Sequence, residues 1–319
     1  MTKISNIGLG TAAIGRPLYI NIKNTAQTGG VFNITEFKQE GMQVLESAYQ
    51  KGIRYFDTAP GYGLSEQLLI EWLQEKNDPT IKIGTKWGYT YVANFDSNAD
   101  VHEIKEHSLS KLNEQWEVSK QLLPYLSFYQ IHSATLDTGV LENEKILNRL
   151  HEIKKKYSVQ VGITASGANQ LEILEKASAI SIDNEILFSV YQCTFNMLEQ
   201  SIRKVDQLFK NGTQLIIKEA LANGRVFNNS NYPEYNSFYA YLEKLESELQ
   251  VGRDAIILSY CSTIYPNAIV LSGANNETHL SSNLNAPKVK LTGTQIDELS
   301  KFKVAAEFYW NERKKLTWN

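Results

Sequence analysis

The chain has 319 residues, a formal net charge of −3 and a hydrophobic fraction of 42%. This composition suits a globular protein, and so small a charge gives no reason to expect nucleic acid or an acidic membrane surface as a partner. Cys193 and Cys261 stand alone and cannot build a disulfide framework or a zinc site. Polar residues interrupt every apolar run before it could span a bilayer, and Met1–Ile4 lacks a signal-peptide core. We therefore expect a cytoplasmic protein.

Apolar runs of strand length alternate with helical patterns along the whole chain. This alternation predicts parallel βαβ units, and an equal count of strands and helices closes most naturally as a barrel. The expected fold class is α/β, a (β/α)8 TIM barrel in which residues 1–319 form a single domain and the chemistry lies at the carboxyl ends of the strands. The expected strands are Ile7–Gly10, Ile53–Phe56, Ile81–Thr85, Leu126–Ile131, Val159–Ile163, Ile186–Tyr191, Gln214–Ile217 and Ala268–Leu271.

The connection after the first strand is long. Residues 16–33 show neither helical nor strand period, and loops of this length are usually functional lids or disordered. Because this one leaves the strand at the active-site rim, we expect a lid over the pocket, with a passive loop as the alternative. Asn33 can then cap a helix that ends at Gly52.

Two later stretches also predict helices. Asp100 with Glu103 resembles a capping arrangement for a helix whose apolar positions include Ile104, Leu112 and Trp116. Residues 287–319 predict a C-terminal helical tail of two helices, which either reaches over the active site or packs against the barrel wall. Within that tail, the basic run 313–315 is expected to be a solvated helix face.

Four polar side chains follow expected strands at the rim of the barrel. Asp57 ends strand two, and Tyr62 lies on the next loop, which residues 60–63 break with proline and glycine. Lys86 ends strand three and His132 follows strand four. A phenol, an ammonium, a carboxylate and an imidazole gathered at one rim suggest proton transfer to or from an oxygen.

Each of these four residues has an expected role. Tyr62 is the candidate acid for a carbonyl oxygen that gains negative charge, and because a phenol has a pKa of about 10, a nearby cation must favour its ionised form. Lys86 supplies that cation, Asp57 keeps it charged and in place, and His132 orients the substrate oxygen. The alternative reading is a structural ion pair, a packed aromatic and a core histidine bonded to backbone.

The same residues carry a family resemblance. The pattern Asp-Thr-Ala-x-x-Tyr-Gly-x-Ser-Glu of residues 57–66, the lysine after strand three and the Ile-His after strand four resemble the aldo-keto reductase superfamily, and the likeness extends from Ile7 to Leu284. The resemblance implies an eight-stranded α/β barrel that interconverts carbonyls and alcohols with a nicotinamide cofactor and without a metal.

The resemblance also implies cofactor contacts at the ends of strands one, five, six, seven and eight. Two departures from the family pattern affect them: Ala165 follows Thr164 where a Ser-Asn pair is usual, and Lys218 stands where an aromatic often stacks. Glu219 is an unusual neighbour for phosphates, and a ribose contact is the role left for it. The implied cofactor residues are Gly10, Thr11, Thr164, Gln192, Lys218, Glu219, Leu221, Gly273, Ala274, His279 and Asn283.

The adenosine-phosphate site implied by the resemblance lies at the start of a helix, where backbone N–H groups favour phosphate. His279 stands where many members have a basic residue that grips the 2′-phosphate of NADP, and an imidazole is mostly neutral at pH 7. Family habit favours NADP(H), with NAD(H) as the alternative. Trp87, with Tyr89 and Tyr91, is expected to line the substrate pocket, or else to cover the barrel rim.

The sequence thus predicts an NAD(P)(H)-dependent oxidoreductase acting on an aldehyde, ketone or aldose, as a monomer or small homo-oligomer. One alternative is a nicotinamide-binding regulatory module with little turnover. Another is a barrel lyase with a Schiff base on Lys86 or Lys218. A metal-dependent hydrolase has the least support, because the five histidines show no ligand spacing.

Overall fold

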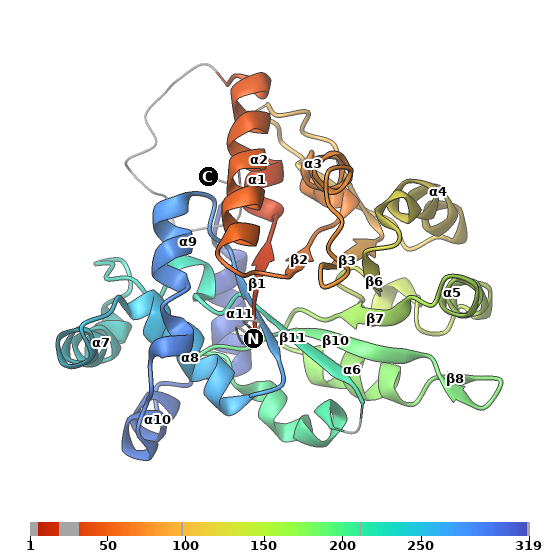
Figure 1. The fold of residues 1–319 in the computed structure, drawn as a ribbon. Helices are drawn as coiled ribbons and strands as arrows, with labels where there is room; N and C mark the ends of the chain where they lie inside the picture. Colours follow the sequence, from red (N-terminus) through yellow and green to blue (C-terminus); the bar gives the residue numbers. More distant parts are fainter. Residues whose placement is uncertain (1–5, 19–31, 97, 211, 318–319) are drawn as a thin grey trace.

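A computed structural model describes residues 6–18, 32–96, 98–210 and 212–317. Eight parallel strands close a barrel in the order β1-β12-β11-β10-β7-β6-β3-β2, and Figure 1 shows them at the centre with helices outside. This confirms the expected (β/α)8 fold. The barrel strands are β1 Ile7–Gly10, β2 Tyr55–Asp57, β3 Lys82–Trp87, β6 Leu126–Ile131, β7 Gln160–Thr164, β10 Phe188–Thr194, β11 Gln214–Lys218 and β12 Ile269–Ser272.

Helices follow most of the barrel strands. None of the described helices is both long enough and apolar enough to cross a membrane. The α-helices are α1 Ala12–Gly15, α2 Ile34–Gln50, α3 Ser65–Leu73, α4 Leu109–Ser119, α5 Glu144–Tyr157, α6 Gln170–Ser178, α7 Asn236–Leu249, α8 Arg253–Ile264, α9 Glu277–Asn283, α10 Gly293–Ser300 and α11 Ala306–Lys314. The 3-10 helices are η1 Pro60–Tyr62, η2 Lys120–Leu122, η3 Leu136–Thr138, η4 Ser201–Phe209, η5 Ala222–Gly224, η6 Pro233–Tyr235 and η7 Ala286–Lys288.

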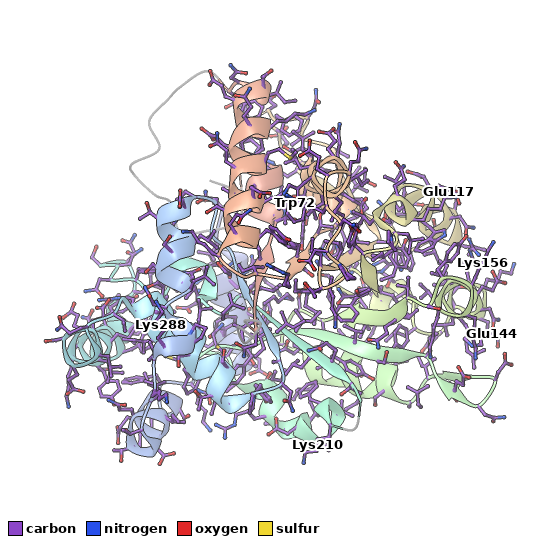
Figure 2. All side chains as sticks on the ribbon, viewed as in Figure 1. Trp72, Glu117, Glu144, Lys156, Lys210 and Lys288 are labelled. Carbon is purple, nitrogen blue, oxygen red and sulfur yellow. The ribbon has the colours of Figure 1, made fainter. Side chains whose placement is uncertain are left out.

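The core has two parts because each barrel strand is covered on both faces. A large cluster fills the space between strands and helices. It includes Trp72, a residue of α3 whose side chain lies against α2. A small cluster of Tyr55, Phe128, Val190, Ile216 and Leu271 fills the barrel interior. Figure 2 shows charged side chains such as those of Glu117, Glu144 and Lys156 on the outer helices. Both cysteines are buried and free.

The two local predictions at the start of helices had different outcomes. Asn33 does cap α2, since its side chain accepts hydrogen bonds from the backbone N–H groups of Thr35 and Glu36. The helix expected after Asp100 is present as α4, which contains Leu112 and Trp116, but its expected start is wrong: Glu103–Lys105 is strand β5, which pairs antiparallel with β4, Tyr89–Tyr91. Cross-strand pairing outweighs the cap-like spacing there, and α4 begins only after its own cap, Ser108.

Three further expectations concern segments outside the barrel. Most of the lid predicted over 16–33 lies outside the described residues. A second hairpin, β8 Ser181–Ile182 with β9 Glu185–Ile186, precedes β10, so strand six begins later than expected, at Phe188. The tail does contain the two helices predicted for it, α10 and α11.

Candidate active site

Neighbouring strand ends place a lysine against an aspartate inside the barrel. Gly10 of β1 and Gly84 of β3 lie beside Asp57 in the parallel register, so β2 ends in the middle of this group. Lys86 is fully buried, and its Nζ donates to Asp57 Oδ2 at 2.5 Å and to the Thr58 carbonyl at 2.9 Å. A buried ammonium needs such partners, because an isolated charge is costly to desolvate.

Tyr62 stands over this ion pair. It ends η1, and the centroid of its ring lies 4.9 Å from Lys86 Nζ and 5.4 Å from the ring of His132, which it meets edge-on. The four side chains that sequence reasoning chose as catalytic therefore lie together at the carboxyl rim. Of the three protons on Lys86 Nζ, two are bonded to the residues named above.

The charges around Tyr62 keep its proton in place. Burial and then the Asp57 carboxylate raise the pKa of the Tyr62 phenol well above its ordinary value, whereas the Arg16 guanidinium lowers that pKa. Lys86, the cation expected beside the phenol, is itself paired with Asp57. Because its pKa is raised, Tyr62 is protonated in the free protein and can act as an acid.

His132 is neutral in this environment. Burial, followed by the positive charges of Lys86 and Arg16, lowers its pKa well below the ordinary value. Its Nδ1 is buried without a hydrogen-bond partner in the described part of the chain, while its carbonyl oxygen lies 3.0 Å from His107 Nε2. Burial lowers the pKa of His107 to about 4, so this second imidazole is also neutral.

Two residues predicted to touch the cofactor are bonded to Asp57. Gln192 Nε2 donates to Asp57 Oδ1 at 2.7 Å, and Thr11 Oγ1 donates to the Asp57 carbonyl at 2.9 Å. The Tyr55 hydroxyl, two positions earlier in β2, donates to Asp57 Oδ1 at 3.3 Å. Asp57 therefore has a partner on each carboxylate oxygen, and the amide oxygen of Gln192 accepts no hydrogen bond among the described residues.

The other predicted cofactor residues on β7 and β11 also face this rim. Thr164 Oγ1 accepts a hydrogen bond from the Ser133 N–H at 2.6 Å. Lys218 Nζ donates to Ser166 Oγ at 2.8 Å and to Thr194 Oγ1 at 2.9 Å. Burial lowers the pKa of Lys218. Lys218 thus joins the ends of three strands rather than standing as an unpaired side chain.

Glu219 is paired with a residue of the last described helix, α11. Its Oε1 accepts from Nη2 and Nε of Arg313 at 3.0 and 3.1 Å, and its side chain is 9% exposed. The expectation of a solvated face at 313–315 is therefore wrong for Arg313, although it holds for the exposed Lys314 and Lys315. Leu221 is partly buried and packs against the core.

A second ion pair joins the same loop to α11. Arg225 is fully buried, and its Nη1 donates to Glu312 Oε2 at 3.1 Å, while the guanidinium lies 4.0 Å from the centroid of the Tyr309 ring. The Tyr235 hydroxyl also donates to Glu312. Helix α11 therefore packs on the loop after β11, where the resemblance implies cofactor contacts.

The turn from β12 to α9 has the expected openness at one position. A Cβ added to Gly273 would meet no atom within 4 Å. Ala274 is buried, and Asn283 is occupied by Ser272 Oγ and Asp254 Oδ2, each 2.6 Å away. His279 is exposed, and its Nδ1 lies 3.0 Å from Asn276 Nδ2, the amide of the residue that caps α9.

Trp87, expected to line the substrate pocket or else to cover the barrel rim, packs outside the barrel strands in the free protein. Trp87 follows the inward-facing Lys86 and so points out of the barrel, where it is fully buried and meets the ring of His107 edge-on. Tyr89 lies closer than Trp87 to the candidate catalytic side chains, because the centroid of its partly buried ring is 4.6 Å from that of His132. Tyr89 and Tyr91 belong to the hairpin β4–β5 beside the rim.

Sequence reasoning missed Arg16 and Glu103. The Arg16 guanidinium lies 5.2 Å from the centroid of the Tyr62 ring, and its Nη1 donates to Glu103 Oε2 at 2.8 Å. A single arginine in a long irregular loop carries no periodic signal, and Glu103 has the spacing of a helix cap.

Two surface hollows, of about 450 and 440 Å³, lie away from this rim.

Comparisons with known proteins agree on one family. Residues 6–303 match the model of the aldo/keto reductase family. The aldo-keto reductase str7 of Strobilurus tenacellus is 22% identical over 95% of this chain and 90% of its own. D-threo-aldose 1-dehydrogenase of a Pseudomonas species is 33% identical over 30% of each chain. The solved glycerol dehydrogenase AKR11B4 from Gluconobacter oxydans has a TM-score of 0.69 at 20% identity, covering 95% of this chain and 92% of that one.

Proposed function

The chain belongs to the aldo/keto reductase family of oxidoreductases, and from that premise we propose that it interconverts a carbonyl compound and its alcohol with Tyr62 as the proton donor and acceptor. The observation that carries this proposal is the position of the Tyr62 ring, 4.9 Å from Lys86 Nζ and edge-on to a neutral His132. Aldehydes, ketones and aldoses are the proposed substrates.

The chain's own residues account for the proton. Tyr62 carries its proton in the free protein because burial and Asp57 raise the pKa of the phenol. It can therefore donate to a carbonyl oxygen that gains negative charge, which is the task of a general acid. The remaining proton of Lys86 Nζ can then stabilise the phenolate, while His132 donates a hydrogen bond to the same substrate oxygen.

The rim fits a nicotinamide dinucleotide, which supplies the hydride for such a reduction when bound. The free amide oxygen of Gln192 and the Thr164 hydroxyl can hold a carboxamide. The open backbone at Gly273 leaves room for a phosphate at the turn before α9. Glu219 Oε1 is paired with Arg313 and the Asn283 amide with Ser272 and Asp254, so these two residues give the proposal less support than Gln192 and Thr164 do.

We propose NADP(H) as the cofactor, with NAD(H) as the second candidate because the exposed carboxylate of Glu277 stands in the first turn of α9, salt-bridged to Lys51 at 3.3 Å. A carboxylate there disfavours a further phosphate. Dissociation constants for NADPH and NADH, measured by quenching of protein fluorescence, decide between the two.

The proposal is tested with a panel of aldehydes, ketones and sugars, run with both reduced cofactors and followed by nicotinamide absorbance. Tyr62→Phe removes only the reacting hydroxyl, so we expect kcat to fall by about 10²- to 10⁴-fold while cofactor affinity changes by less than about twofold. Tyr241→Phe on α7 is the matched control, since it removes a phenol hydroxyl outside the barrel.

Two results would contradict the proposal. Retention of most of the wild-type rate by Tyr62→Phe would remove Tyr62 from the chemistry. Tight cofactor binding without turnover of any panel member would favour the alternative of a nicotinamide-binding regulatory module. A covalent adduct trapped by borohydride on Lys86 or Lys218 would favour the Schiff-base lyase.

A further inference from the structure

Three segments of the chain meet around the turn that carries Tyr62. A Cβ added to Gly15, at the end of α1, would collide with the Tyr62 carbonyl and the Ser65 hydroxyl. A Cβ added to Gly61 would lie 2.9 Å from Tyr89 Cβ in the hairpin β4–β5. The end of α1, the turn that carries Tyr62 and the hairpin are therefore packed so closely that a Cβ at position 15 or 61 would clash.

Arg16 binds all three of these segments. It follows α1 directly, its Nη1 donates to the Gly61 carbonyl at 2.9 Å, and the same nitrogen donates to Glu103 Oε2 of the hairpin at 2.8 Å. The Arg16 side chain is 4% exposed and that of Glu103 is 25% exposed. A buried guanidinium with this geometry fixes the turn as well as the charge beside it.

We propose that Arg16 is a positioning residue for Tyr62, holding the turn through Gly61 and keeping a positive charge beside the phenol while the proton moves. Glu103 holds Arg16 in place. This rests on the proposed function, because it assigns Arg16 a part in the proton transfer by Tyr62.

The charges that face Tyr62 explain why another cation matters there. Asp57, Glu103 and Glu219 all raise the pKa of the Tyr62 phenol, and His132 is neutral. Lys86 is already paired with Asp57. Arg16 thus opposes the effect of these carboxylates on the phenol, with its guanidinium 5.2 Å from the centroid of the Tyr62 ring.

The test compares four variants with the wild type. Arg16→Ala should lower kcat by about 10- to 100-fold, since it loses both the grip on the turn and the charge. Arg16→Lys keeps the charge and should retain several-fold more turnover than Arg16→Gln, which keeps only a hydrogen-bond donor. Glu103→Gln leaves Arg16 charged but weakens the contact that holds it, so its kcat should fall by less than that of Arg16→Ala.

The matched control is the pair Arg253 and Glu246, which has similar burial, at 11% and 28% exposed, and joins the ends of α7 and α8. Arg253→Ala should leave kcat unchanged. Millimolar guanidinium chloride should restore part of the turnover of Arg16→Ala, a response that a purely structural role would not give.

The proposal is overturned if Arg16→Ala stays within about threefold of wild type in kcat, or if Arg16→Gln equals Arg16→Lys. The comparison of Arg16→Lys with Arg16→Gln decides the matter even if Arg16→Ala does not fold. Tyr62→Phe is assayed beside these variants. If Arg16 is dispensable but Tyr62→Phe is inactive, only this inference fails and the proposed function stands.

Discussion

Two buried ion pairs hold different parts of the rim, and they are built in different ways. Lys86 and Asp57 join adjacent strands, and every carboxylate oxygen of Asp57 has a partner. Arg225 and Glu312 join a loop to the last helix, 87 positions apart in the chain. Near this second pair, Arg225 Nη2 and Glu219 Oε2 are buried without hydrogen-bond partners in the described ranges.

The difference shows how the two regions are positioned. Register between parallel strands sets the first pair, so the geometry of Lys86 and Asp57 is complete within the barrel. Docking of α11 sets the second pair, so the loop after β11 depends on a contact that forms outside the barrel. Changes to the strand pair should affect turnover, whereas changes to the loop pair should affect cofactor affinity.

The largest expected effect comes from Asp57→Asn, which leaves the Lys86 charge buried and uncompensated. We expect a loss of about 3 to 5 kcal/mol in the free energy of unfolding, measured with denaturant, together with loss of turnover. The double variant Asp57→Asn/Lys86→Met should regain most of the stability and none of the activity. Full stability in the single variant would show that the pair is not desolvated.

A second buried carboxyl near the strand pair should give a pH dependence. Burial raises the pKa of Glu66 from 4.5 to about 7, although Thr85 and Ser119 donate to it. The folded state binds this proton more tightly than the unfolded chain, so the free energy of unfolding should fall as the pH rises from about 4.5 to about 7. The fall should be about 3 kcal/mol.

Glu66→Gln should remove this slope in denaturant titrations at several pH values. Glu46→Gln is the control, because hydrogen bonding to Lys76 lowers the pKa of Glu46 to about 2, below the tested range. A slope that survives in Glu66→Gln would assign the pH dependence to another group.

A smaller effect is expected from Glu312→Gln, because a neutral amide keeps the shape and one hydrogen bond to Arg225. The free energy of unfolding should fall by about 1 to 2 kcal/mol, and cofactor affinity should weaken while kcat stays near wild type. Calorimetric titration with NADPH and NADH measures the affinity. A loss as large as that of Asp57→Asn would erase the contrast between the two ion pairs.

The smallest effect concerns the exposed turn before α9. His279→Arg places a permanent cation where the imidazole stands, so NADPH should bind about tenfold more tightly while NADH changes by less than about twofold. Fluorescence titration of both cofactors measures this. Equal gains for both cofactors would place the 2′-phosphate elsewhere.

The same contrast explains what the sequence could predict. Asp57, Lys86 and His132 each follow a buried strand, so the rule that parallel strand ends share one rim was enough to bring them together. Arg313 and Glu219 are 94 positions apart, and neither has a spacing that indicates a partner. Their pairing depends on where α11 docks, which local patterns do not specify.

Local patterns also failed where two readings competed. Glu103 has the spacing of a helix cap, but strand pairing with Tyr91 places it beside Arg16. Trp87 is adjacent to Lys86 in sequence, but alternation along a strand sends adjacent side chains to opposite faces. That alternation applied to β3 places Trp87 on the outer face of the barrel, which agrees with its membership of the outer core cluster.

The contacts of α11 bear on the order in which the protein is completed during synthesis. A ribosome synthesises the chain from its N-terminus, so the strands that carry Asp57 and Lys86 emerge long before Glu312 and Arg313. Asp57 and Lys86 can therefore come together in a nascent barrel while the loop after β11 still lacks α11, the helix that anchors it. The ability to retain a dinucleotide should be among the last properties the newly made protein acquires.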